Sequence, residues 1–173
     1  MQSYQCVYRA SHEKGDTVLL YSYEKPGKIR MDIEKPKKGA VLIYNPAQSN
    51  KVRVRPFPAT PFINFNFNLN DDKVKSKSGG TVDRSDLGSR LESFCAELSS
   101  AGKNAQVVYY DGGRPQGVVI SGGPKDRVKV FSFGEDGLLK RIEVTESGKK
   151  AQTSEWSDLK LNPKFKPDFF EKF

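Results

Sequence analysis

The strictest pattern in this chain is the alternation of residue types from Lys28 to Glu34. Three apolar residues, Ile29, Met31 and Ile33, alternate there with charged ones. Successive side chains of a strand point to opposite faces of a sheet, so this period of two predicts a strand with one apolar and one solvated face. A sheet that leaves one face in water is typically antiparallel.

Similar short runs fill most of the chain. Glycine, proline and asparagine separate them at the spacing of hairpin turns, as at residues 26–27, 134–137 and 147–148. The glycine pairs at 112–113 and 122–123 are also interpreted as turns, because neither lies in the GxGxxG frame of a phosphate-binding loop. The stretch 57–78 is either an edge strand or a mobile aromatic flap. Strands are expected at residues 4–9, 17–23, 28–34, 40–44, 51–55, 105–110, 116–121, 127–133, 138–146 and 151–161.

One helix is expected after the glycine pair at 79–80. Ser85 or Asp83 can cap its start, and Gly102 can end it. Its apolar residues recur at helical spacing and form one stripe, which in a β protein must lie on a sheet face. This stripe consists of Leu87, Leu91, Phe94, Cys95 and Leu98. Together these patterns predict a mainly β, curved antiparallel sheet of about ten strands, with the helix covering its concave face, in a single domain spanning residues 1–173.

The charge of the chain favours anionic partners. Lys and Arg number 29 against 21 Asp and Glu, for a net charge of +8. Nucleic acid is disfavoured, because the cations are scattered and no reader motif is present. No apolar run approaches the roughly 20 residues of a membrane-spanning helix. The first residues also lack a signal-peptide pattern, which fits either a cytoplasmic start or a mature chain with an added methionine.

The residues that usually carry catalysis are sparse. His12 is the only histidine and falls in an expected turn, and the acidic pairs at 71–72 and 135–136 fit solvated surface. Cys6 and Cys95 lack metal-ligand spacing, so they are either two buried thiols or one disulfide. We therefore expect no enzymatic activity, no metal and no cofactor.

Two hairpins resemble those of the LolA-type periplasmic lipoprotein carriers. Residues 23–36 read YEKPGKIRMDIEKP, a basic-proline turn followed by an alternating strand that ends in proline. Residues 41–46 read VLIYNP, a strand that ends in aromatic-Asn-Pro. Residues 131–142 are similar to the late hairpin of the family, and residues 156–163 are similar to its closing strand.

This resemblance implies an open antiparallel half-barrel in the periplasm. Its apolar hollow would bind the acyl chains of lipids or lipoproteins for transport or sorting to the outer membrane, and an inner- or outer-membrane protein would be a further partner. The family's inward-facing strand residues correspond to Ile29, Met31 and Ile33, and its basic residue before the turn proline corresponds to Lys25.

The candidate site is an apolar set with a cationic rim. Lys25, Lys28 and Arg30 would meet an anionic headgroup. The expected ligand-binding residues are Tyr21, Tyr23, Ile29, Met31, Ile33, Tyr44, Val52, Val54, Leu87, Leu91, Phe94, Phe131 and Phe133.

Two other interpretations remain open. The same apolar residues can simply pack the helix onto the sheet. Alternatively, the chain is a non-enzymatic protein-binding or envelope-stress sensor module of the same fold. Its partner-binding elements would then be the aromatic segment 57–67 and the C-terminal tail 165–173.

Overall fold

The computed structural model describes residues 1–13, 15–60, 62–76, 79–109, 113, 115–122 and 124–173. The expected features at residues 14, 77–78, 110–112 and 123 lie outside the described residues.

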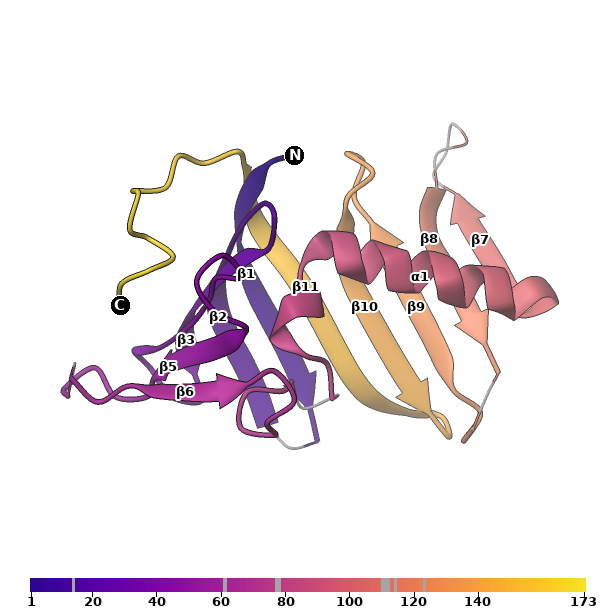
Figure 1. Cartoon of the computed structure of the whole chain (residues 1–173). Helices are drawn as coiled ribbons and strands as arrows, with labels where there is room; N and C mark the ends of the chain where they lie inside the picture. Colours follow the sequence, from indigo (N-terminus) through magenta and orange to yellow (C-terminus); the bar gives the residue numbers. More distant parts are fainter. Residues whose placement is uncertain (14, 61, 77–78, 110–112, 114, 123) are drawn as a thin grey trace. The chain divides into compact units, whose positions relative to one another are not determined.

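Within the part of the chain that the structure describes, eleven strands form one open antiparallel sheet (Figure 1). Their order is β6-β5-β4-β3-β2-β1-β11-β10-β9-β8-β7, so that β6 and β7 are the edges. The mainly β, open antiparallel fold is thereby confirmed, and the aromatic stretch contributes the edge strand β6. The strands are β1 (Ser3–His12), β2 (Gly15–Glu24), β3 (Lys28–Lys35), β4 (Ala40–Tyr44), β5 (Lys51–Arg55), β6 (Phe65–Asn68), β7 (Ala105–Tyr109), β8 (Pro115–Ser121), β9 (Val128–Phe133), β10 (Leu139–Glu146) and β11 (Lys149–Leu161).

The chain divides into two compact units. The first unit comprises Met1–Tyr8, Asp16–Asp86 and Ser157–Phe173, and the second comprises Arg9–Gly15 and Leu87–Trp156. The first unit contains β3 to β6 with most of β2, and the second contains the helix α1 (Leu87–Ala101) with β7 to β10.

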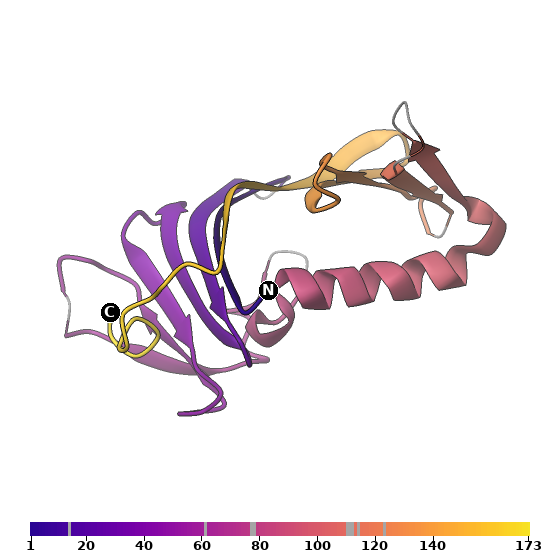
Figure 2. The same cartoon turned by 90° about the horizontal axis from the view of Figure 1, so that it is seen from above.

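In the second unit, α1 runs across β8, β9 and β10 (Figures 1 and 2). Phe94 anchors it, since the Phe94 ring centroid lies 4.6 Å from that of Phe131 and 5.8 Å from that of Phe133. Lys129 of β9 also donates hydrogen bonds of 2.7 and 2.6 Å to the carboxylate of Glu97 on α1. Aromatic packing and an ion pair thus hold one side of the helix on the strands.

The buried side of α1 is narrower than its apolar stripe. Leu87 and Phe94 are buried and Leu98 is half-buried, but Leu91 is 39% exposed and Cys95 is exposed. Leu91 and Cys95, four residues apart, lie on one flank of the stripe. The expectation that the whole stripe is covered is therefore wrong for these two residues.

The ends of α1 are set by residues on either side of it. The helix starts at Leu87, so Asp86 immediately precedes it, and neither Ser85 nor Asp83 caps it as expected. Asp83 belongs instead to the short 3₁₀ helix η1 (Val82–Arg84), and the Ser85 hydroxyl donates a 2.6 Å hydrogen bond to the Val82 carbonyl. At the other end, Gly102 adopts a φ of 51° directly after the last residue of α1, and the expectation that Gly102 ends the helix is confirmed. Gly102 is also the first residue of the 3₁₀ helix η2 (Gly102–Asn104).

The packing of α1 predicts unequal effects of two truncations. Phe94→Ala removes a buried ring and should lower the free energy of unfolding by about 3 to 4 kcal/mol. Leu91→Ala, on the same helix but at a partly exposed site, should lower it by less than about 1 kcal/mol. Urea unfolding monitored by circular dichroism measures both values. Equal losses would show that the helix is not anchored through Phe94.

Candidate functional site

A row of five apolar side chains crosses five strands of the first unit. Tyr21 of β2 pairs with Met31 of β3, Met31 with Leu42 of β4, Leu42 with Val54 of β5, and Val54 with Phe65 of β6. Directly opposed residues of antiparallel strands point to the same face. We call this line of side chains the Tyr21 row.

Further apolar residues flank the Tyr21 row on the same face. Tyr23, Ile29 and Tyr44 are paired along one side of it, and Leu19, Ile33 and Ala40 are paired along the other. Val52 of β5 pairs with Phe67 of β6 and lies two residues from Val54. All eight expected ligand-binding residues of the first unit thus share one face of its sheet.

The Tyr21 row is most exposed at its β6 end. Tyr21 is 5% exposed and Leu42 is 7% exposed, whereas Phe65 at the sheet edge is 46% exposed. Met31 and Val54 are half-buried. The β2 end of the row is therefore packed, and its β6 end is accessible.

The packed end is organised around the Tyr21 hydroxyl. It shares a 2.9 Å hydrogen bond with the hydroxyl of Ser85, and the Tyr21 ring stacks on Tyr4 at 5.8 Å between centroids. Burial, followed by the charge of Asp86, raises the pKa of Tyr21. The hydroxyl consequently stays neutral and acts as a structural partner of the segment that leads into α1.

The segment around η1 also approaches the other tyrosines of this face. Tyr44 is buried, and its burial, followed by the charge of Asp83, raises its pKa. Tyr23 shows the same direction, through burial and then the charge of Asp86. Two carboxylates thus stand near the phenol groups at this end of the apolar face.

The other five expected ligand-binding residues lie in the second unit. Leu87 and Phe94 of α1 are buried, as is Phe131 of β9. Phe133 is half-buried against Phe94, and Leu91 is partly exposed. Phe94, Phe131 and Phe133 form the contact between α1 and its own strands. The candidate set therefore consists of two groups, one in each unit.

The three expected rim cations have different surroundings. Lys25 is exposed and is the first residue of the turn that follows β2. Lys28 forms a 2.7 Å ion pair with Glu24. Arg30 alternates with Ile29 and Met31 along β3 and so lies on the opposite face of the sheet from the Tyr21 row.

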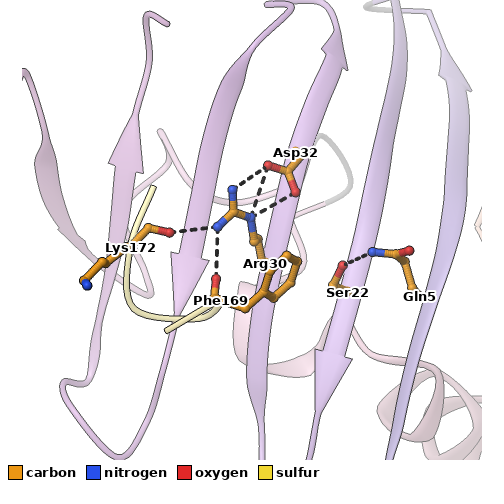
Figure 3. A network of polar contacts seen from close by, with 6 residues as sticks. All are labelled: Gln5, Ser22, Arg30, Asp32, Phe169 and Lys172. Atoms are coloured by element: carbon orange, nitrogen blue, oxygen red, sulfur yellow. Dashed lines mark hydrogen bonds and ion pairs between the residues drawn. The ribbon is translucent and has the colours of Figure 1, made fainter. Parts of the chain in front are cut away.

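On that opposite face, Arg30 holds the C-terminal tail (Figure 3). Its Nη1 donates hydrogen bonds of 3.0 and 2.8 Å to the carbonyls of Phe169 and Lys172. Nη2 of Arg30 forms an ion pair of 3.0 Å with Asp32. The central carbon of the guanidinium group, Cζ, lies 4.7 Å from the centre of the Phe169 ring. One side chain thereby joins strand, carboxylate and tail.

Arg53 makes a second attachment of the tail. It donates a 2.6 Å hydrogen bond to the carbonyl of Glu171 and lies 5.0 Å from the centre of the Phe173 ring. Ile43 pairs with Arg30 on one side and Arg53 on the other, and it is 1% exposed. The tail therefore covers apolar surface of its own sheet. The tail contains four phenylalanines. Such a density of aromatic residues could have predicted that the tail packs on the sheet.

Neither cysteine is in a disulfide, and both thiols are free. Cys6 is buried, as expected, whereas Cys95 is exposed, so the expectation of two buried thiols is wrong for Cys95. Burial raises the pKa of the Cys6 thiol to about 12. Cys6 thus stays protonated and packs as a small apolar residue.

Neither a metal site nor a membrane-spanning helix is present among the described residues. No group of three or more His, Cys, Asp or Glu side chains there could hold a metal ion. Among the same residues, no helix has both the length and the apolar character needed to cross a bilayer.

Comparison with known proteins gives structural likenesses. No protein-family model and no curated protein sequence matches the chain. An uncharacterized conserved protein from Thermus thermophilus is similar, with a TM-score of 0.56 and 8% identity over 99% of this chain and 85% of the other. That likeness supports the fold.

Two proteins of the resembled family are also among the matches. A putative outer membrane lipoprotein-sorting protein domain from Vibrio parahaemolyticus is 10% identical over 98% of this chain and 89% of the other, with a TM-score of 0.43. A LolA superfamily protein from Nitrosomonas europaea is 10% identical over 97% and 89%, with a TM-score of 0.39. With TM-scores below 0.5, these two likenesses do not assign a function.

The two thiols should react differently with an alkylating reagent. In the folded protein at about pH 8, iodoacetamide should modify exposed Cys95 and leave buried, protonated Cys6 unmodified, because the thiolate is the nucleophile. Intact-mass spectrometry should show one adduct in buffer and two in urea. Cys95→Ser should show none in buffer, and rapid double labelling of the folded protein would contradict the burial of Cys6.

Loss of the Arg30 contacts should release the tail. Arg30→Ala removes two hydrogen bonds to tail carbonyls and leaves Asp32 unpaired, so the free energy of unfolding should fall by about 2 kcal/mol. Chymotrypsin cleavage after the tail phenylalanines should become faster. Lys172→Ala is the matched control, because its side chain is 77% exposed. Unchanged cleavage in Arg30→Ala would show that other contacts hold the tail.

Proposed function

We propose that this chain is a non-enzymatic carrier that binds acyl chains of lipids or lipoproteins on the apolar face of its first unit. The observation that carries the proposal is the Tyr21 row, a continuous apolar line across five strands that is packed at one end and accessible at the other. The resemblance of residues 23–46 to the LolA-type hairpins supports the same role.

The length of the row suits one acyl chain. Neighbouring strands lie about 4.8 Å apart, so five strands span roughly 19 Å. The hydrocarbon core of a bilayer is about 30 Å thick, and a chain from one leaflet therefore reaches about 15 Å. Each buried methylene contributes about 0.8 kcal/mol, so contact along much of the row would give useful affinity.

Met31, Val54 and Phe65 are the residues we assign to direct contact with the chain. They are half-buried or exposed, whereas Tyr21 and Leu42 are already buried within the protein. Exposed apolar surface of this kind gains most from a ligand, because water leaves both surfaces. The packed residues would shape the floor beneath the ligand.

The carrier role includes a headgroup contact and a compartment. Lys25 is exposed and is the rim cation that we assign to an anionic headgroup. The other two are already engaged, because Lys28 is paired with Glu24 and Arg30 binds Asp32 and the tail. A carrier of lipoproteins to the outer membrane works in the periplasm, with a membrane protein as donor or acceptor. We propose this location and this kind of partner for the chain.

One observation favours the alternative of a protein-binding module. The edge strand β7 exposes Val107, Val108 and Tyr109, at 39%, 40% and 58%. An edge strand with accessible apolar side chains can accept a further strand from another protein. A stable complex with a protein, in the absence of any bound lipid, would support this second function.

A charge in the Tyr21 row should abolish lipid binding. Native mass spectrometry of the purified protein, followed by organic extraction, should detect a bound acyl lipid in the unmodified chain. Met31→Lys places an ammonium within the row, between Tyr21 and Leu42, and should lower acyl-lipid occupancy at least about tenfold, because the charge must be desolvated. Phe65→Lys, at the accessible end of the row, should lower it less.

Val130→Lys is the matched control. Val130 of β9 is also half-buried, and it pairs with Glu143 of β10 in the second unit. The Val130→Lys variant should fold and retain bound lipid. Circular dichroism would show that each variant is folded. An unmodified chain that takes up no lipid after incubation with phospholipid vesicles, or a folded Met31→Lys variant that binds normally, would contradict the carrier proposal.

A further inference from the structure

The segment between β5 and β6 exposes large apolar side chains. Phe62 is 80% exposed, Phe57 is 51% exposed and Ile63 is 37% exposed. Backbone hydrogen bonds hold this segment, from the Thr60 amide to the Phe57 carbonyl at 3.3 Å and from the Ile63 amide to the Thr60 carbonyl at 3.0 Å. We call Phe57, Phe62 and Ile63 the aromatic loop. Large apolar side chains that are exposed together in this way indicate an interaction site.

Cations surround the aromatic loop. Residues 35–70 contain no Asp or Glu. They contain six cations, which are Lys35, Lys37, Lys38, Lys51, Arg53 and Arg55. Four of these stand at one end of the sheet, because β3 and β5 end at Lys35 and Arg55 where β4 and β6 begin.

We call residues 36–39, the turn between β3 and β4, the cationic turn, and two contacts join it to the segment that carries the aromatic loop. The Lys37 ammonium lies 5.8 Å from the centre of the Phe57 ring. A Cβ on Gly39 would meet Pro58 at 2.8 Å, and Gly39 has a φ of 82°, so only glycine allows the turn to approach this closely. The lysines at 37 and 38 are therefore positioned beside the exposed phenylalanines.

The positive charge of this turn is available to a partner. Lys37 is exposed, and Lys38 is paired only loosely with Glu34, at 3.8 Å between two side chains that are 83% and 59% exposed. Solvent-exposed ion pairs of this kind contribute little to stability, so their charged groups can pair with another ion instead. An anion can compete for both ammonium groups.

We propose that the aromatic loop is a membrane-docking element that inserts into the interface of a bilayer with anionic headgroups. Phenylalanine and isoleucine side chains enter the boundary between headgroups and acyl chains, while lysines beside them contact lipid phosphates. The absence of acidic residues from 35–70 fits a negatively charged surface. This inference does not depend on the proposed carrier function, since surface docking requires no ligand on the Tyr21 row.

The proposal predicts binding to anionic vesicles through two separable contributions. The purified full chain should sediment with vesicles of phosphatidylcholine containing roughly one-third phosphatidylglycerol, and much less with phosphatidylcholine alone. Phe62→Ser/Ile63→Ser should weaken binding to the anionic vesicles about tenfold or more. Lys37→Ser/Lys38→Ser should weaken it about fivefold per lysine at low salt and reduce its salt dependence.

Tyr109→Ser is the matched control, because Tyr109 is 58% exposed on β7 of the second unit and should not affect docking. Lack of vesicle binding by the unmodified chain would overturn the proposal, as would unchanged binding of Phe62→Ser/Ile63→Ser. A dimer that this double variant converts to a monomer, without vesicle binding, would assign the loop to a second copy and overturn it as well. Phe62→Ser/Ile63→Ser should retain uptake of a soluble fluorescent fatty acid, which separates docking from carrier function.

Insertion can be observed directly at position 62. The single native tryptophan, Trp156, is buried and provides a constant background. Phe62→Trp should show a blue-shifted emission on addition of anionic vesicles, and lipids that carry a quencher near the headgroup should reduce it. An emission spectrum that stays that of a water-exposed indole, even though the protein sediments with vesicles, would exclude insertion and overturn the proposal.

Discussion

Cross-strand pairing from β2 to β6 determines which face each side chain of the first unit occupies. Tyr21, Met31, Leu42, Val54 and Phe65 face the same way only because each is directly opposite the next. A slip of one residue between β2 and β3 would move β3's entire apolar set to the other face. The alternation from Lys28 to Glu34 opposes such a slip, since it would bury charges and expose Ile29.

The same register creates a second, cationic face. Arg30 and Arg53 stand on either side of Ile43, and the C-terminal tail uses both guanidinium groups and their stems as its attachment. The tail thus protects one face within the chain itself. The Tyr21 face remains accessible toward β6. This asymmetry between the two faces is the main reason to look for a ligand on the Tyr21 face.

Much of the fold follows from local patterns in the sequence. The alternating strand, the glycine-containing turns, the single amphipathic helix and its end at Gly102 all reflect interactions between near neighbours. The shared face of Ile29, Met31 and Ile33 was also predictable from the period of two, whereas the alignment of Tyr21 with them depends on the register between β2 and β3. The exposure of Leu91 and Cys95 was not predictable, because the width of the buried side of a helix depends on how far the underlying strands extend.

The sequence by itself determined the class of fold and the two-faced character of its strands, because backbone periodicity decides which side chains share a face. Tertiary structure alone decided that Arg30 binds the carbonyl groups of the C-terminal tail and that the aromatic loop lies beside the lysines at 37 and 38. Phe169 and Arg30 are 139 residues apart, and the turn with Lys37 and Lys38 reaches the aromatic loop through the Lys37–Phe57 contact and the close approach of Gly39 to Pro58. Such contacts depend on chain folding over long separations, which no local pattern encodes.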